Sequence, residues 1–164
     1  MNRRSPSSGT HRAPEDLDRI DRLILQVLQA NGRKPISELA RELNLTTSPC
    51  LDRVRRLEGE GYIQGYAARL NHRQLGARLL AFVGVRVDRT TPEVFEQFRT
   101  IVESREEILE CHMIAGGFDY LVKIRVADMD AYRKFLGEHL SALPGIAQIH
   151  TYVAMEEVKS TLGS

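Results

Sequence analysis

Apolar residues recur at helical spacing through the first part of the chain and predict two short helices there. From residue 17 to residue 28 an apolar position follows every three or four residues, with charged positions between them. Asn31 and Gly32 then supply a stop signal. A second, shorter repeat fits a helix over 35–43, because Pro35 is tolerated in an opening turn.

A third helix is predicted after a tight turn. Ser48 followed by Pro49 predicts its start, because a capping hydroxyl precedes a residue with a preset φ, and Gly59 predicts its end. The residues after it, 62–70, indicate a short hairpin or an extended arm. Three helices followed by such an arm predict a winged helix-turn-helix, with the helix-turn-helix at about 36–55.

The pattern of apolar residues in the second half of the chain predicts a sheet with two helices. Thr91-Pro92 and Asp128 are predicted helix starts, and the predicted strands cover residues 80–87, 108–114, 120–126 and 146–155. The order βαββαβ predicts an α+β fold, the ferredoxin-like (ACT-like) arrangement with helices on one face of an antiparallel sheet. A second subunit is expected to cover the other face, so we expect a dimer.

The balance of charge changes near the point where the helical pattern gives way to the pattern of strands. Residues 1–76 hold 13 Lys and Arg against 9 Asp and Glu, whereas residues 77–164 hold 10 against 13, so +4 and −3 sum to the net +1. The excess of positive charge near the N-terminus suits contact with a polyanion. We therefore expect a flexible tail over 1–14, a DNA-binding domain over 15–76, and a second domain over 77–164.

Composition excludes several other classes of protein. No stretch approaches the roughly 18 apolar residues that a membrane helix needs, and no apolar segment follows the basic N-terminus as in a secretory signal. The only cysteines, Cys50 and Cys111, are too few for a disulfide framework. The five histidines lack a partnered nucleophile, and no metal-binding or phosphate-binding motif is present. We expect a cytoplasmic protein that is not an enzyme and needs no metal or cofactor.

We expect the exposed side of the third helix to carry the side chains that read DNA. On an ideal helix its apolar residues fall on one side and its polar residues on the other or on the flank. Arginines reach guanine edges or phosphates, hydroxyls serve either, and a carboxylate accepts from cytosine. The predicted contacts to double-stranded promoter DNA are Thr46, Thr47, Ser48, Asp52, Arg53, Arg55 and Arg56.

Several long motifs give the chain a family resemblance. They are LDRIDR at 17–22, PCLDRVRRLE at 49–58, GYIQGY at 61–66, VFEQF at 94–98, GGFDYL at 116–121 and TYVAMEEVK at 151–159. In this order they closely resemble the Lrp/AsnC family, over about residues 15–160. The resemblance implies a bacterial, nucleoid-associated transcription regulator whose dimers assemble further, into octamers or hexadecamers.

The resemblance also implies that residues 77–164 form an effector-binding and oligomerisation domain. Its effector is a small amino acid, with leucine favoured. Gly116 and Asp119 occupy the family's Gly-x-x-Asp turn, and Met129, Tyr152 and Val153 match positions linked to leucine response. In such a site Asp119 would accept from the ammonium group, while amides around Gly116 and Gly117 would approach the carboxylate.

Plainer interpretations of both sites stay open from the sequence. The glycine pair suits a simple turn with Asp119 as its hydrogen-bonded partner, and arginine-rich helix faces are often merely solvated. The alternative function is an amino-acid-binding regulatory module that acts on a protein partner rather than on DNA.

Overall fold

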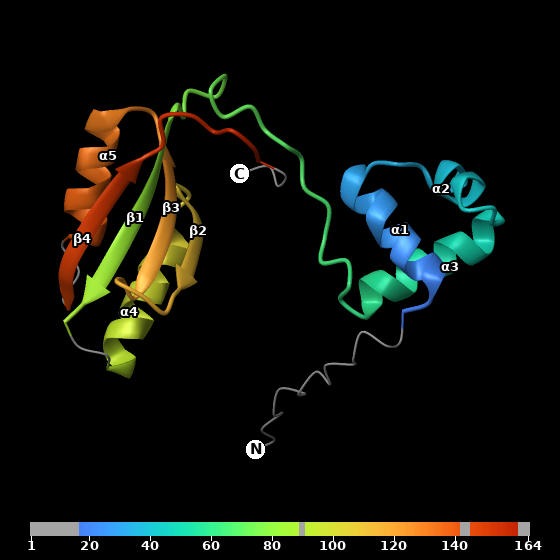
Figure 1. Ribbon diagram of the computed structural model, residues 1–164, viewed down its shortest axis with the longest axis horizontal. Helices are drawn as coiled ribbons and strands as arrows, with labels where there is room; N and C mark the ends of the chain where they lie inside the picture. Colours follow the sequence, from blue (N-terminus) through green and yellow to red (C-terminus); the bar gives the residue numbers. More distant parts are fainter. Residues whose placement is uncertain (1–16, 89–90, 142–144, 161–164) are drawn as a thin grey trace, which may run out of the picture. The chain divides into compact units, whose positions relative to one another are not determined.

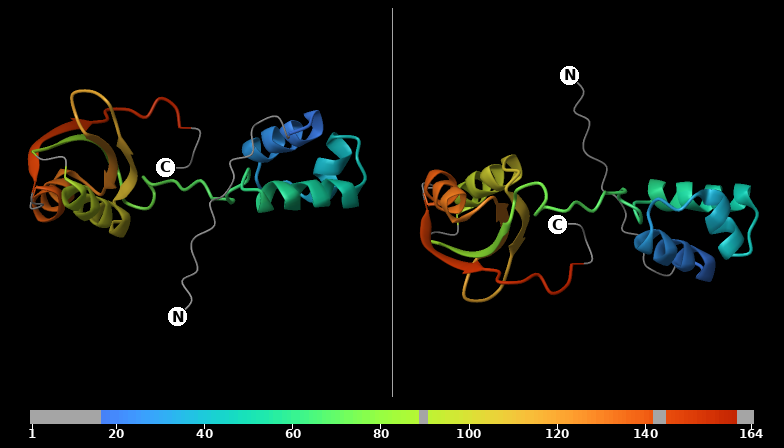
Figure 2. Two further views of the ribbon diagram at one scale, coloured as in Figure 1. Left: turned by 90° about the horizontal axis from the view of Figure 1, so that it is seen from below. Right: turned by 90° about the horizontal axis from the view of Figure 1, so that it is seen from above.

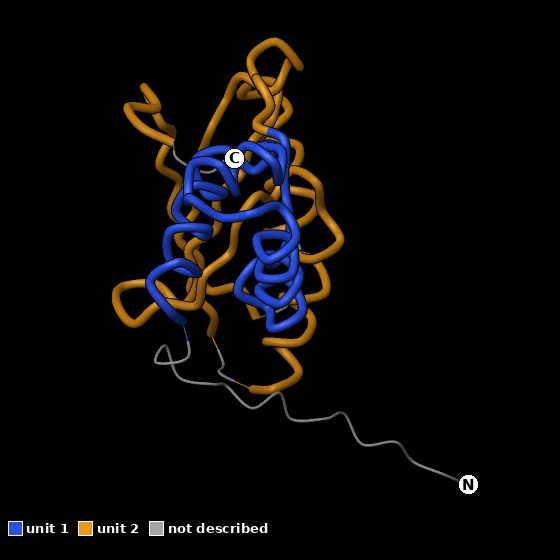
Figure 3. The backbone as a smooth tube through the Cα atoms, turned by 90° about the vertical axis from the view of Figure 1, so that its right-hand side faces the viewer, with its two compact units in different colours: residues 1–68 blue, residues 69–164 orange. Residues whose placement is uncertain are grey.

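The chain folds into two compact units. The computed structural model describes residues 17–88, 91–141 and 145–160, so the predicted tail at 1–14 lies outside the described part. Contacts between residues divide the chain between Ala68 and Arg69, as Figure 3 shows. The predicted domain boundary was Gly76, and residues 69–76 instead group with the second unit.

Three helices make up the first unit: α1 (Arg19–Ala30), α2 (Ile36–Glu42) and α3 (Thr47–Gly59) (Figure 1). Asp18 caps α1 in a capping box, because its carboxylate accepts from the Asp21 amide while the Asp21 carboxylate accepts from the Asp18 amide. The predicted apolar positions pack together in the core formed by Ile24, Leu28, Leu39, Ala40, Cys50, Val54 and Leu57.

Helix α3 begins earlier than the Ser48-Pro49 pair predicts. Its N-cap residue is Thr46, in an extended conformation, and Ser48 already lies in the first turn. Pro49 is tolerated there because the first amides of a helix have no partner within it. The prediction of Ser48 as the cap is therefore wrong, although the end at Gly59 is confirmed.

The arm predicted over 62–70 continues from α3 without forming a strand. Its start is held on the first unit by Tyr62 and Ile63, which pack against the core, and by Tyr66. The Tyr66 hydroxyl donates to Glu58 Oε1 over 2.9 Å, and its ring lies against Gly32. Of the two predicted forms, the extended arm is the one observed.

The second unit is a four-stranded antiparallel sheet with helices on one face (Figures 1 and 2). Its elements are β1 (Leu79–Val87), α4 (Pro92–Ser104), β2 (Ile108–Met113), β3 (Tyr120–Val126), α5 (Met129–Phe135), a π-helical turn η2 (Leu136–Leu140) and β4 (Ile146–Val153). The strand order β2-β3-β1-β4 is that of a ferredoxin-like fold. This confirms the predicted βαββαβ order.

Alternation along the strands sorts side chains between the two faces of this sheet. The helix-covered face carries Ala81, Val83, Val85 and Val87 of β1 beside Val122 and Ile124 of β3, packed against aromatic residues of α4 and α5. The other, outer face carries residues that pair with one another in the register: Phe82 with Lys123 and Tyr152, and Gly84 with Leu121 and His150. No helix of the described residues is long and apolar enough to cross a bilayer.

Candidate nucleic-acid interface and effector site

The N-terminal part of α3 presents an exposed polar surface. Thr46, Thr47 and Ser48 are exposed at its start, and Asp52 and Arg55 are exposed along its outer side. The Thr46 side chain makes no capping hydrogen bond, so the amides of Thr47 and Ser48 remain available to an anion. Hydroxyls, amides and a guanidinium on one side of a helix suit contact with phosphates and base edges.

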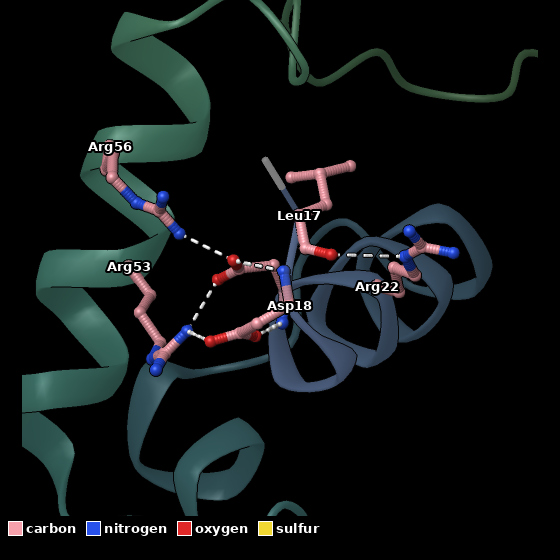
Figure 4. A network of polar contacts seen from close by, with 6 residues as sticks. Leu17, Asp18, Arg22, Arg53 and Arg56 are labelled. Atoms are coloured by element: carbon pink, nitrogen blue, oxygen red, sulfur yellow. Dashed lines mark hydrogen bonds and ion pairs between the residues drawn. The ribbon is translucent and has the colours of Figure 1, made fainter. Parts of the chain in front are cut away.

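Two of the predicted contact arginines bind carboxylates of α1 instead of projecting freely (Figure 4). Arg53 Nη1 lies 2.5 Å from Asp18 Oδ2 and 2.8 Å from Asp21 Oδ1, and Arg56 Nη2 lies 2.6 Å from Asp21 Oδ2. We call these four residues the Asp–Arg cluster. Each oxygen of the Asp21 carboxylate thus accepts from a different arginine of α3.

The Asp–Arg cluster keeps its carboxylates ionised. Burial alone would raise the pKa of Asp21, which is only 1% exposed, but hydrogen bonds from Arg56 and Arg53 outweigh burial and lower it. The Asp21 amide, followed by Arg53, lowers the pKa of Asp18. The cluster therefore ties α3 to α1 through paired charges.

This arrangement divides the three arginines of α3 by role. Arg53 and Arg56 are 30% and 40% exposed and already have partners, whereas Arg55 is exposed and has no ion pair within the described residues. The sequence interpretation missed Asp21, which it placed among the polar positions of the first helix. Asp21 follows Asp18 by three residues, as Arg56 follows Arg53, and this matched spacing was the available signal for ion pairs between the two helices.

The loop between β2 and β3 holds the predicted effector residues Gly116, Gly117 and Asp119. Both glycines are exposed, and a Cβ on either would meet no atom within 4 Å. Asp119 Oδ2 accepts from the Val87 amide over 2.8 Å, and the Asp119 amide donates to the Val85 carbonyl. Asp119 therefore fastens the loop to the end of β1 with one carboxylate oxygen.

An aromatic contact fixes the same loop on the outer face of the sheet. The Phe118 ring lies over Gly84, where a Cβ would come within 2.7 Å of the ring carbons. The ring also lies near His150 and Tyr152, with centroids 5.4 and 6.4 Å away. Gly84 is thus required for close approach, and Tyr152 belongs to this aromatic group.

Met129 and Val153 lie elsewhere in the second unit. Val153 pairs with Ala81 and so belongs to the helix-covered face, and Met129 opens α5 on that same side. Met129, Tyr152 and Val153 are 45%, 54% and 42% exposed. The six predicted effector residues therefore do not gather around one point within a single chain.

The described residues place no cysteine or histidine in a metal-binding group. The described residues contain no group of three or more His, Cys, Asp or Glu placed to hold a metal ion. Cys111 pairs with Val122 on the helix-covered face, whereas His112 pairs with Leu121 on the outer face, as predicted for neighbours on a strand. Burial raises the pKa of the Cys111 thiol to about 11, which disfavours the reactive thiolate.

Two family models match the chain, one for each unit. Residues 17–64 match a model described as winged helix-turn-helix DNA-binding, and residues 80–163 match one described as the Lrp/AsnC ligand binding domain.

Curated relatives and solved structures match the chain along most of its length. The chain is 56% identical over 153 residues to a leucine-responsive regulatory protein from Serratia marcescens, covering 93% of each chain. It is 56% identical over 150 residues to that of Escherichia coli strain K12, covering 92% of each. A transcriptional regulator from Neisseria meningitidis, solved in complex with L-Met, is 34% identical at a TM-score of 0.85, over 90% of this chain and 96% of that one.

Proposed function

Because the chain belongs to the Lrp/AsnC family of transcription regulators, we propose that it binds promoter DNA through the exposed polar side of α3 and that an amino acid alters this binding. The observation that carries the proposal is the exposed polar side of α3, held at a fixed angle to α1 by the Asp–Arg cluster. A rigidly held recognition helix can place its side chains in register with base edges. A catalytic step forms no part of this function.

Each exposed residue of α3 has a distinct part in this proposal. The hydroxyls of Thr46, Thr47 and Ser48, with the free amides beside them, contact phosphates and fix the register of the helix on DNA. Arg55 donates to a guanine edge or a phosphate, and Asp52 accepts from cytosine. Arg53 and Arg56 act mainly by holding α3 in place, and their remaining N–H groups add to the positive potential.

The effector in this proposal is a small apolar amino acid, with leucine first, since the relatives above are named leucine-responsive. The second oxygen of Asp119 accepts from its ammonium, and the exposed amides at Gly116 and Gly117 bind its carboxylate. Tyr152 bounds this loop through Phe118. Met129 and Val153 lie on the other side of the sheet, so we place them in a site completed by another subunit.

The proposal includes a homo-oligomer built from dimers, an octamer or a hexadecamer. Helices cover only one face of the sheet, and the outer face leaves Phe82 and Leu121 half-buried. Removing such a face from water favours association. We place the protein in the bacterial cytoplasm on the nucleoid, where its DNA lies. Light scattering after size exclusion, with and without leucine, measures the assembly.

The decisive experiment is a footprint on a promoter fragment, repeated with each candidate amino acid. The proposal expects protected sites whose occupancy or extent changes with one class of amino acid, and an affinity that falls as salt rises. Heat from amino acid binding without any retention of DNA would instead support a module that acts on a protein. If titration calorimetry gives no heat of binding for any amino acid, the proposed response to an amino acid is wrong.

A further inference from the structure

The segment that joins the two units has an unusual balance of charge. Between Glu60 and Asp88 the chain has no acidic residue, but it has four arginines and a histidine: Arg69, His72, Arg73, Arg78 and Arg86. The first four belong to the stretch before β1, directly after the helix-turn-helix. An acid-free basic segment adjoining a DNA-binding motif suits contact with a polyanion.

Part of this segment has a defined turn. The amides of Gln74 and Leu75 donate to the Asn71 carbonyl, and the Asn71 side chain also accepts from Gln74. The Ala77 amide donates to the His72 carbonyl, and Gly76 completes the turn with φ of 88°. The basic side chains therefore project from an ordered backbone, which lowers the entropy lost when they bind.

The four basic residues before β1 line a hollow of about 730 Å³ on the second unit, together with Arg125 and the C-terminal residues Ala154, Met155, Glu156 and Glu157. Two of its cations already have partners: Arg125 pairs with Glu157 at 2.7 Å, and Arg69 Nη2 donates to the Ser160 carbonyl at 2.9 Å. Arg73 and Arg78 are exposed and have no acidic partner within the described residues. Glu156 is the only other acid in the lining, so the hollow keeps an excess of positive charge.

We propose that Arg73 and Arg78 bind phosphates of the DNA backbone that flank the sequence contacted by α3. This inference rests on the proposed function, because it adds a second contact surface to the same complex. Guanidinium groups donate in a planar fork that matches phosphate oxygens. Only the backbone is contacted here, so these residues add affinity and orientation but no choice of sequence.

The test compares the salt dependence of DNA binding between the full-length chain and the double variant Arg73→Gln/Arg78→Gln. Fluorescence anisotropy on a duplex with long flanks gives Kd at several KCl concentrations. Each phosphate contact contributes about 0.9 to the slope of log K against log salt, so the double variant should lose about 1.8 for each subunit that contacts the duplex. The matched control, Arg99→Gln/Arg133→Gln, removes two exposed arginines from α4 and α5 and should leave the slope unchanged.

Further arms separate phosphate contact from other roles. Arg73→Lys/Arg78→Lys should restore most of the slope, since lysine also neutralises phosphate, whereas a purely structural role for the guanidinium would not be rescued. Light scattering on both double variants checks that assembly is the same as in the wild type. Calorimetry with pyrophosphate, without DNA, tests the other source of the same chemistry.

The outcomes distinguish this inference from the proposed function. If the wild type binds DNA and Arg55→Gln weakens it, but the Arg73/Arg78 double variant keeps the full slope, the flanking contact is wrong and the function stands. Tight pyrophosphate binding, lost in that double variant while the DNA slope stays the same, would overturn the contact in favour of a small-anion site. If the wild type retains no DNA at all, the proposed function itself fails.

Discussion

Removing the charge of Asp21 tests whether the Asp–Arg cluster holds the recognition helix in place. The variant Asp21→Asn keeps the shape of the side chain but replaces a carboxylate that accepts from two guanidinium groups, at 2.8 and 2.6 Å. Arg53 and Arg56 would then face a neutral amide. We expect the first unit to lose stability while the second unit is unchanged.

The size of the effect follows from the burial of the three groups. Breaking a fully buried pair costs about 3–5 kcal/mol. Asp21 is 1% exposed, but Arg53 and Arg56 are 30% and 40% exposed, so water replaces part of the lost interaction. We therefore expect a loss of about 2–3 kcal/mol, a large fraction of the stability of so small a unit.

Hydrogen exchange read by mass spectrometry measures the two units separately. Protection of amides in α1 and α3 should fall by about 30- to 150-fold, since 1.36 kcal/mol is a factor of ten. Protection of β1 serves as the internal reference. The matched control is Asp52→Asn, which makes the same chemical change at an exposed position of α3 and should stay within about 0.5 kcal/mol of the wild type.

The result that would refute this reasoning is equal protection in the two variants. An independent check comes from pH. The pKa values of Asp18 and Asp21 lie below the ordinary value of 3.8 in the folded chain. Their contribution is therefore complete above that value and is lost as pH falls through the lowered values. The acid-induced loss of protection in α1 should be shallower in Asp21→Asn.

Three further predictions follow from the two sites. Arg55→Gln should weaken DNA binding and flatten its salt dependence without changing the melting temperature. Arg56→Gln should mainly lower the melting temperature, because Arg56 belongs to the Asp–Arg cluster. If the two variants gave the same anisotropy and the same calorimetric melting curves, the separate roles of Arg55 and Arg56 would be wrong. Asp119→Asn keeps an acceptor for the Val87 amide of β1 but loses the charge that would bind the ammonium group of leucine. Titration calorimetry should therefore show an affinity for leucine at least tenfold weaker, with DNA binding retained. An unaltered affinity would mean that the ammonium group binds elsewhere. Gly84→Ala should destabilise the second unit by about 1–3 kcal/mol in urea melts, because the new methyl collides with the Phe118 ring. The control Gly117→Ala adds a methyl in open space and should not destabilise it. Equal urea midpoints for the two variants would mean that the Phe118 ring moves aside freely.

Local patterns predicted most of the architecture. The strand at Tyr120–Val126 has the predicted bounds, because strict alternation places every second residue in the core. Asp128 caps α5 as predicted, by accepting from the Ala131 amide. Such features depend on neighbours within a few residues, and the sequence displays those neighbours directly.

The matched spacing of its residues was a signal for the Asp–Arg cluster, but a local pattern does not show that the two helices meet. The partners of Asp21 lie 32 and 35 residues away, and an aspartate between apolar helix positions is usually solvated. Burial of such a group becomes acceptable only when a second helix brings two arginines to it. The fit of Phe118 over Gly84 is similar, since only the register of β1 shows which glycine lies beneath the loop.

The helix that begins at Thr47 divides its circumference between two tasks. The side facing α1 carries the residues on which folding depends, and the opposite side carries those that we propose contact DNA. On that proposal, mutations at Thr47, Ser48, Asp52 and Arg55 alter operator preference at small cost in stability. Paralogues derived from such a chain can diverge to recognise different promoters while they keep the same scaffold and the same metabolite sensor.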